Sequence, residues 1–293
     1  MINASLVKEL RDKTGAGMMD CKAALVATNG DIEQAIDWLR EKGIVKAAKK
    51  ADRIAAEGLC SIAVDGNNCY IYELNSETDF VAKNEMFLEL LNKVGQVAIQ
   101  AGAGSVEEVL HVVLDGETNL EKLIADATFK IGEKISLRRV LKITKSGTQN
   151  FGVYKHMGGR IATVTVVEGA SEEVAKDVAM HTAAMNPKFL NRNSVNPETI
   201  EHEKHIFTQE ALSEGKPLAI VEKMVVGRVQ KYLKEICLVD QPFVKNPDVT
   251  VAEYVKNNHG SVSSFVRFEV GEGMEKRVDD FAAEVMAAVN SSK

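Results

Sequence analysis

Cysteines are few in this chain, and they are not arranged in pairs. The four thiols are widely separated and form no C-x-x-C motif: Cys21, Cys60, Cys69 and Cys237. Scattered thiols are typical of reduced, packed cysteines, whereas a disulfide framework or a zinc site needs closely spaced pairs. The pattern therefore predicts no metal site and favours a cytoplasmic location.

Long apolar runs are absent as well. No stretch reaches the ~18 residues that a membrane span requires. The first residues, MINASLVKELRDK, carry charges where a signal peptide would have an apolar core. We therefore expect no association with membranes.

Neither a basic excess nor many aromatic residues are present. The net charge of -6 argues against nucleic acid as the main ligand, although local basic patches remain possible. Aromatic residues make up only 5% of the chain, which predicts helix-rich packing on alanine and valine. A length of 293 residues with 45% hydrophobic residues gives room for two or more domains.

The common catalytic and nucleotide-binding motifs do not occur. The chain has no G-x-x-x-x-G-K-[ST] loop, no G-x-S-x-G elbow and no H-E-x-x-H motif. Gly15-Ala16-Gly17 and Gly271-Glu272-Gly273 lack the third glycine and the parallel strand of a dinucleotide fingerprint, so they indicate helix boundaries. We expect no cofactor, no direct nucleotide binding and no covalent chemistry. An enzyme with a site assembled from scattered residues is the weaker alternative.

One pair of histidines stands at helical spacing. His202 and His205 could share a metal ion, but no third ligand follows nearby. A solvated helix face explains this pair better than a metal site.

Residues 1–52 show the pattern of three short helices. Glycine and asparagine separate them at Gly15 and at Asn29, and Asp31 is placed to cap the third helix. The expected apolar faces are Leu6, Val7 and Leu10; Met18, Met19, Ala23, Leu25 and Val26; and Ile32, Ala35, Ile36 and Leu39. Because so small a unit has a marginal core, we expect it to dock on a larger one through a basic helical linker, residues 42–53.

Residues 53–145 and 146–270 repeat one pattern of strands and helices. Residues 59–64 and 70–74 predict a hairpin followed by a helix that ends at Ala101, a helix over 121–132 and a strand over 134–143. Residues 150–154 and 160–167 predict a second hairpin, followed by a helix over 172–185. The same tripeptide, Val-Ala-Lys, occurs at the two helices, as residues 81–83 and 174–176. This repetition suggests a duplicated β-β-α unit with antiparallel sheets. The core parts are 53–145, 146–190 and 237–270.

A helical hairpin is predicted between the two parts of the second core unit. Residues 191–236 lose the strand signal, and Gly215, Lys216 and Pro217 turn the chain between two helices. The expected contact faces are Ile200, Phe207 and Ala211 on the first helix, and Leu218, Val221, Met224, Val225, Tyr232 and Leu233 on the second. These apolar faces could also support a homodimer.

The C-terminal part of the chain is expected to return to the sheet and then leave it. Residues 249–257 predict a helix and residues 262–270 a strand that rejoins the second sheet. Residues 271–293 predict a helical module whose face carries Val278, Phe281, Ala282 and Val285. This face could pack on the core or contact another protein, with Phe281 as a partner-binding candidate.

Residues 75–84, NSETDFVAKN, form the most distinctive local pattern. An apolar strand runs directly into an acidic and aromatic tip, and a helical pattern follows. Local preference favours Thr78 or Asp79 as a helix cap and Phe80 as a core anchor. The alternative is that Phe80 points outward as a wedge against another protein.

Several runs of residues together resemble bacterial elongation factor Ts. The similarity extends from the first helix to the last, and the TGAGMMDCK and TDFVAKN runs are its most specific parts. The matching runs are 14–22, 29–31, 78–83, 138–139, 158–161 and 267–273. The resemblance implies an α+β fold with a ubiquitin-associated-like N-terminal domain, a two-part core, a coiled-coil hairpin and a C-terminal module.

The resemblance also implies a function and a set of contacts. The family is a guanine-nucleotide exchange factor for the GTPase elongation factor Tu. Its magnesium-displacing segment corresponds to Thr78, Asp79, Phe80 and Val81, its N-terminal contact to Met18, Met19 and Lys22, and a further contact lies near His156.

Structural roles compete with these contacts. Met18 and Met19 could be core residues, His156 could be merely solvated, and Arg138 and Arg139 are better placed to brace a strand through carboxylates than to touch RNA. A non-catalytic adaptor that binds proteins through its N-terminal helices is the remaining alternative function.

Overall fold

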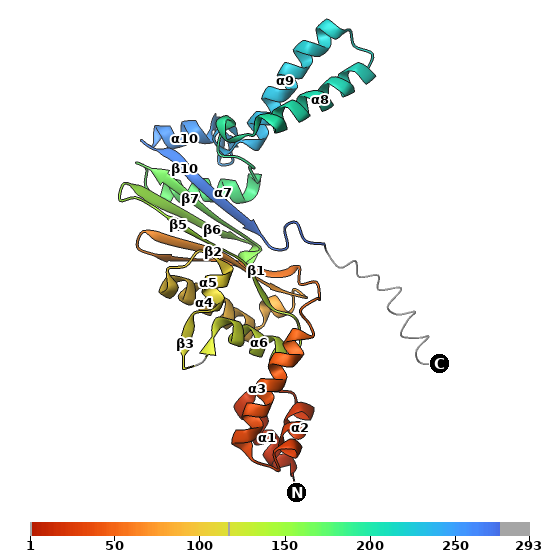
Figure 1. Cartoon of the computed structure of the whole chain (residues 1–293). Coiled ribbons are helices and arrows are strands. Elements are labelled where there is room, and N and C mark those ends of the chain that lie inside the picture. Colours follow the sequence, from red (N-terminus) through yellow and green to blue (C-terminus); the bar gives the residue numbers. More distant parts are fainter. Residues whose placement is uncertain (1, 117, 276–293) are drawn as a thin grey trace. The chain divides into compact units, whose positions relative to one another are not determined.

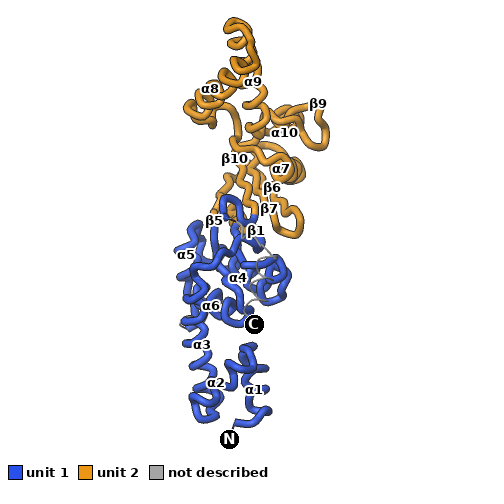
Figure 2. The backbone as a smooth tube through the Cα atoms, turned by 90° about the vertical axis from the view of Figure 1, so that its right-hand side faces the viewer, with its two compact units in different colours: residues 1–59, 72–140, 270–293 blue, residues 60–71, 141–269 orange. Residues whose placement is uncertain are grey.

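Helices and small sheets alternate along the chain, which confirms the α+β class (Figure 1). The computed structural model describes residues 2–116 and 118–275. Figure 2 shows the two compact units that these residues form. The first unit holds the described residues among 1–59, 72–140 and 270–293, and the second holds residues 60–71 and 141–269.

Three helices open the chain, and their ends follow local capping chemistry. Helix α1 (Ala4–Thr14) begins at Asn3, whose Oδ1 accepts the amide hydrogen of Leu6 at 2.8 Å, and it ends at Gly15 with φ 68°. Helix α2 (Met18–Ala27) follows, and α3 (Ile32–Ala48) begins at the predicted cap Asp31. Side chains from all three helices form one apolar cluster, which includes Leu10, Cys21, Ala24, Leu25 and Leu39.

One expectation for this region was wrong. Helix α2 buries Cys21, Ala24 and Leu25, whereas Met18, Met19 and Val26 lie outside this stripe and are exposed. The basic segment 42–53 is helical through Ala48 as a continuation of α3. Helix α3 contacts helix α6 within the first unit, where Phe129 of α6 packs against the N-terminal cluster.

The first sheet has the strand order β1-β2-β5, with β1 (Glu57–Asp65), β2 (Asn68–Ser76) and β5 (Ser136–Thr144). Helix α4 (Glu85–Ala101) follows β2 and buries an apolar face that includes Phe87, Leu91 and Val94. The remaining elements before β5 are η1 (Val81–Lys83), α5 (Val106–Leu110), β3 (Val113–Asp115), β4 (Thr118–Asn119) and α6 (Leu120–Ile131). Helix α6 contacts α4, and it ends at Gly132 with φ 92°.

The second sheet has the order β10-β7-β6, with β6 (Gln149–His156), β7 (Ile161–Glu168) and β10 (Ser261–Glu269), and both pairs are antiparallel. Helix α7 (Glu172–Met185) lies close against it. A Cβ at Gly152 would stand 1.9 Å from the carbonyl oxygen of Ala175, so only glycine fits there. Thr165 and Thr163 donate their hydroxyl hydrogens to the carbonyls of Ala175 and Ala179, at 2.7 Å and 2.8 Å, which ties α7 to β7.

The two sheets share one chain order. We call β1, β2, α4 and β5 the first repeat and β6, β7, α7 and β10 the second repeat; in each, a hairpin leads to a helix, and the last strand lies beside the second strand of the hairpin. The tripeptide Val-Ala-Lys that the two repeats share does not occupy equivalent structural positions, however. Residues 81–83 form the short turn η1 before α4, whereas residues 174–176 lie inside α7.

A helical hairpin separates α7 from β10, as the sequence predicts. Helices α8 (Pro197–Ser213) and α9 (Leu218–Ile236) contact each other around Ala211, Val221, Val225 and Val229. Leu218, expected in this contact face, is exposed. The second unit also contains η2 (Met157–Gly159), η3 (Arg192–Ser194), η4 (Leu238–Asp240), β8 (Pro242–Phe243), β9 (Asn246–Thr250) and α10 (Val251–Asn257).

The expected C-terminal helix, including Phe281, falls outside the described residues except at its first positions. Within the described part of the chain, no helix combines the length and apolar character that crossing a membrane would require.

Candidate partner-binding site

The connection between β2 and α4, residues 77–84, has a defined path that begins at a buried residue. Ser76 is fully buried, and its hydroxyl donates to the carbonyl oxygen of Thr78 at 2.9 Å. Val81 and Ala82, in the turn η1, are buried again. Helix α4 then starts at Asn84, whose Oδ1 accepts the amide hydrogen of Met86 at 2.9 Å. The backbone is therefore anchored on both sides of Phe80.

Two carboxylates fix the middle of this connection. Thr78 donates its amide and its hydroxyl hydrogens to the carboxylate of Glu133, at 2.9 Å and 2.7 Å. In return, the amide of Lys134 donates to Glu77 at 2.6 Å, and the Arg53 guanidinium lies 3.3 Å from the same carboxylate oxygen. We call Glu77, Thr78, Glu133 and Lys134 the corner clamp. Each side of the clamp supplies one carboxylate and one backbone amide to the other.

Phe80 points away from the core. Its residue is 79% exposed, although its backbone has ordinary helical angles. The interpretation of Phe80 as a core anchor is thus wrong, and the helix cap is Asn84 instead of Thr78 or Asp79. The buried apolar residues are the two that follow Phe80, which leaves the ring itself available for contact.

An ion pair lies beside the exposed ring. Lys83 places its Nζ 2.8 Å from a carboxylate oxygen of Asp79 and 5.9 Å from the centre of the Phe80 ring. Both charged side chains are largely exposed, so this ion pair contributes about 0–1 kcal/mol to stability. It can therefore be exchanged for other partners at little cost.

The N-terminal candidates lie together on one exposed face of α2. Met18 is 56% exposed, Met19 is 75% exposed, and Lys22 is exposed one turn further along the helix. The competing interpretation of the two methionines as core residues is wrong. Val26, one turn beyond Lys22, extends the same face and was not singled out from the sequence, because the pattern placed it inside.

His156 is an exposed residue at the end of β6, in the second unit. Its ring stacks on Tyr154 with 6.0 Å between ring centres, and its Nδ1 lies 3.3 Å from the tyrosine hydroxyl. Met157 follows with φ 49°, a conformation that non-glycine residues seldom adopt. The exposed Met157 side chain is a neighbouring apolar feature that the sequence pattern did not reveal.

Arg138 and Arg139 brace a buried carboxylate, as expected. Glu73 is fully buried and accepts hydrogen bonds from Arg138 at 3.1 Å and Arg139 at 2.6 Å. The amide of Gly271 donates to the same carboxylate at 2.9 Å, and Arg139 also reaches Glu272 at 3.3 Å. The two arginines thereby fix the segment that follows β10, and they belong to the structural interior of the first unit.

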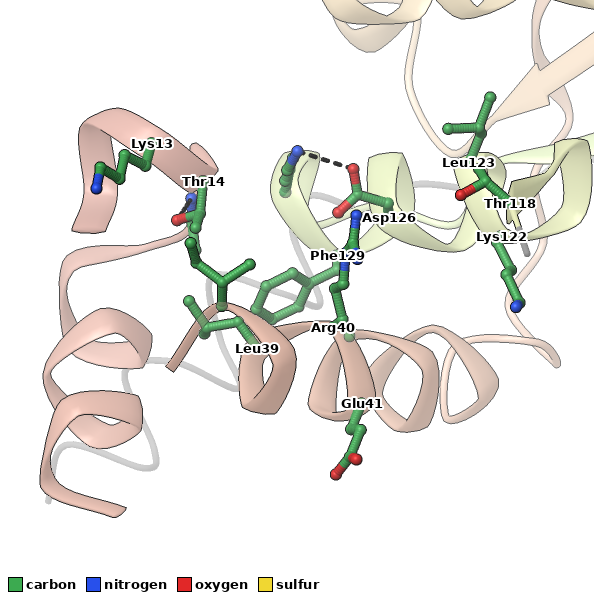
Figure 3. A pocket seen from close by; sticks show the side chains of 14 residues that line it. Lys13, Thr14, Leu39, Arg40, Glu41, Thr118, Lys122, Leu123, Asp126 and Phe129 are labelled. Atoms are coloured by element: carbon green, nitrogen blue, oxygen red, sulfur yellow. Dashed lines mark hydrogen bonds and ion pairs between the residues drawn. The ribbon is translucent and has the colours of Figure 1, made fainter. Parts of the chain in front are cut away.

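An open cavity of about 390 Å³ lies beside the N-terminal helices within the first unit. Figure 3 shows Phe129 of α6 extending toward Leu39 of α3 at one wall of this cavity. Two lysines of its lining are already paired with neighbouring carboxylates, Lys13 with Glu9 at 3.3 Å and Lys130 with Asp126 at 2.8 Å. The lining comes from α1, α3 and α6 and from residues beside them.

Across residues 2–116 and 118–275, no three residues among histidine, cysteine, aspartate and glutamate are grouped so that they could hold a metal ion. What the corner offers is an exposed aromatic ring on a backbone that is held on both sides.

Comparison with known proteins identifies the family. The family model described as "Elongation factor TS" matches residues 77–272, which include the corner clamp and Phe80. Elongation factor Ts of Acholeplasma laidlawii (strain PG-8A) is 56% identical over 293 residues, an alignment that covers 99% of each chain. The chain belongs to the elongation factor Ts family.

Membership in this family assigns the activity. The chain is a translation elongation factor that acts by nucleotide exchange and binds elongation factor Tu, and it is not a catalyst of covalent chemistry. The adaptor alternative is not favoured, because the match extends over the whole chain instead of the N-terminal helices alone.

Proposed function

We propose that Phe80 drives exchange by entering the nucleotide domain of elongation factor Tu behind its magnesium site, which displaces Mg²⁺ and releases GDP. The observation that carries this proposal is the 79% exposure of Phe80 on a backbone fixed from both sides. Thr78, Asp79, Phe80 and Val81 form the magnesium-displacing segment. Within it, Phe80 makes the contact, Thr78 and Val81 hold the backbone, and Asp79 competes for polar groups around the metal.

Thermodynamic linkage sets what this segment must achieve. If the factor weakens GDP binding by some ratio, GDP weakens factor binding by the same ratio. The factor therefore needs contacts that exist only in the distorted GTPase. Burying a phenylalanine side chain contributes about 1.5–3 kcal/mol, which corresponds to roughly one to two decades in affinity.

One ring cannot empty a tight nucleotide site alone, so further contacts must hold the distorted state. We assign these to the exposed face of α2, with Met18, Met19 and Lys22, and to His156 at the end of β6. Phe281 remains a candidate outside the described residues. In this division, the α2 face supplies affinity while Phe80 supplies the distortion.

Substitution of Phe80 by alanine tests the proposal. Phe80→Ala should retain binding to elongation factor Tu with GDP, because the other contacts remain, but the maximal rate of stimulated GDP release should fall by about tenfold or more. Stopped-flow release of a fluorescent GDP analogue measures the rate, and titration measures the affinity. Val113→Ala, which removes another exposed side chain of the first unit, is the control. An unchanged release rate in Phe80→Ala would rule out the wedge.

We further propose that the segments act as modules within the cytoplasm. Residues 1–52 serve as a ubiquitin-associated-like module, residues 53–145, 146–190 and 237–270 form the core, residues 191–236 form a coiled-coil hairpin, and residues 271–293 form a C-terminal module. The three N-terminal helices and the two-helix hairpin support these assignments. Limited proteolysis with mass spectrometry tests them through the position of the first cuts.

Self-association through the hairpin is a separate proposal. Leu212, Leu218 and Ile220 are exposed on both sides of the turn between α8 and α9. Burial of these side chains against a second copy would favour a homodimer. Light scattering at rising concentration should show a dimer for the native chain and a monomer for Leu218→Glu; identical masses for both would contradict the proposal.

A further inference from the structure

Glu133 lies in the loop between α6 and β5, where it can fix the backbone that leads to Phe80. It follows Gly132, at which α6 ends, and precedes β5. Its two carboxylate oxygens accept separate hydrogen bonds from one residue, Thr78, which lies two positions before Phe80. The Phe80 ring itself is contacted by the amine of Lys83, 5.9 Å from its centre, whereas Glu133 holds the backbone that carries the ring.

The two halves of the corner clamp reinforce each other. Glu133 holds Thr78, and the neighbouring Lys134 donates its amide to Glu77 at 2.6 Å. Lys134 also donates its side-chain amine to the carbonyl oxygen of Arg53 at 2.9 Å, which ties the α6–β5 loop to the chain before β1. Moving the connection would therefore require breaking hydrogen bonds to both carboxylates together.

The corner clamp can favour binding to a partner, apart from any contribution to the stability of the fold. A loop that is ordered before binding does not lose further backbone freedom when its side chain enters a partner. An exposed ring on an unrestrained loop would lose that freedom at the moment of insertion. The clamp removes this cost from the exchange step.

We propose that Glu133 is a positioning residue for nucleotide exchange, which acts by holding Thr78 so that Phe80 enters the GTPase without reordering of its loop. This inference rests on the proposed function of Phe80. It assigns Glu133 no contact with the partner. Its effect must therefore pass through Thr78 and depend on the presence of the Phe80 ring.

The chemistry of the clamp offers conservative variants. In Glu133→Gln, the amide oxygen can still accept from the Thr78 amide, and its NH₂ group can donate to the Thr78 hydroxyl oxygen. Glu133→Ala removes both acceptors. Thr78→Val removes only the hydroxyl donor, whereas Thr78→Ser retains it.

The second unit supplies a matched control. Glu253 accepts hydrogen bonds from the amide and the hydroxyl of Thr250, at 2.7 Å and 3.0 Å, in the capping box of α10. Glu253→Ala thus removes the same kind of contact, a glutamate that holds a threonine, at a place with no assigned role in exchange. Circular dichroism during thermal unfolding compares the stability loss of the two alanine variants.

GDP release is measured by stopped flow with the full-length factor and elongation factor Tu loaded with a fluorescent GDP analogue. Glu133→Ala should lower the maximal release rate by about tenfold, equal to ~1.4 kcal/mol, and change the half-saturating concentration much less. A loss of folded protein would instead change the half-saturating concentration. Glu133→Gln should recover most of the rate, Thr78→Val should show a smaller loss, and Glu253→Ala should keep the native rate.

A double-mutant cycle with Phe80→Ala decides the route of the effect. If Glu133 acts through the ring, Glu133→Ala has little further effect once the ring is absent. The inference is overturned by an unchanged rate in Glu133→Ala, by no recovery in Glu133→Gln, or by an equal loss in the Phe80→Ala background. Failure of the proposed function looks different, since Phe80→Ala alone would then keep the native rate.

Discussion

Residues 77–84 lead from β2 to α4 in the first repeat, whereas residues 169–171 lead from β7 to α7 in the second repeat. The short connection turns through Gly169 at φ 76°, buries Ala170 and caps α7 with Ser171. The long connection buries Val81 and Ala82 but exposes Phe80. The extra residues of the first repeat thus place an apolar ring in solvent, where burial alone would have placed it inside.

This difference separates two uses of one architecture. In the second repeat, α7 is tied to the sheet through Thr163, Thr165 and the close approach at Gly152. In the first repeat, the corner clamp holds the chain through partly buried carboxylates. The second repeat instead carries its large insertion, the α8–α9 hairpin, after α7. The two repeats thus share a strand order and differ in the connections between their elements.

The largest expected effect comes from loosening the helix of the second repeat. A methyl group at Gly152 would meet the backbone of Ala175, which cannot move aside without shifting α7. We expect Gly152→Ala to lower the free energy of unfolding by about 3 kcal/mol, the upper end for an overpacked core. Hydrogen exchange followed by mass spectrometry should show faster exchange in α7 while α4 keeps its protection.

Gly147→Ala is the matched control, since a Cβ there meets nothing within 4 Å. It should leave the exchange of α7 unchanged. Equal protection of α7 in the two variants would contradict the close packing of this helix, and loss of protection in α4 as well would show that the two repeats unfold as one.

A fall in pH should also affect α7 and α4 differently. His181 of α7 is buried; its Nε2 lies 2.9 Å from the Gln241 side-chain oxygen, and its Nδ1 accepts the amide hydrogen of Val244 at 3.1 Å. Burial lowers the pKa of His181 below its ordinary value of 6.5. As the pH falls below 6.5, this histidine therefore takes up a proton in the unfolded chain but stays neutral in the folded chain. The free energy of unfolding decreases until the pH has fallen below the pKa of the folded state. The buried residues of α4 include no histidine.

Urea unfolding between pH 8 and pH 5 measures this loss, which is at most about 1.4 kcal/mol for each pH unit and proton. His181→Gln should weaken the dependence on pH, because it removes the buried imidazole. The same pH dependence in His181→Gln as in the native chain would exclude His181 as its source.

Much of the fold is readable from the sequence, because its signals are local. Capping by Asp31, the hairpin turns and the break at 215–217 all follow from residues adjacent to the structures that they end. The burial of α2 is not readable in this way. Its stripe is set by contacts with α1 and α3, so the helical pattern alone does not show that Met18, Met19 and Val26 face outward.

In the candidate site too, local features are predictable from the sequence and distant contacts are not. The TDFVAKN run locates the corner, but local preference places Phe80 in the core. The lack of catalytic motifs, the layout of projecting helices and the resemblance to a family together favour its exposure. The clamp was missed because Glu133 and Thr78 are separated by 55 positions in the chain. A glutamate after a helix-ending glycine carries no local signal for a contact so distant.

The smallest expected effects compare the helix caps of the two repeats. Asn84 caps α4 by accepting from Met86 at 2.9 Å, and Ser171 caps α7 by accepting from Val174 at 3.3 Å. Replacement of either cap by alanine should cost about 1 kcal/mol in the free energy of unfolding.

The two changes should differ in function, because only Asn84 ends the connection that carries Phe80. Asn84→Ala should lower the maximal rate of GDP release by about threefold, less than Glu133→Ala, since the burial of Val81 and Ala82 still holds the backbone. Ser171→Ala should keep the native rate at the same loss of stability. Equal release rates in the two cap variants would mean that Val81 and Ala82 alone fix the corner on the side of α4, so that the clamp at Thr78 is its only adjustable restraint.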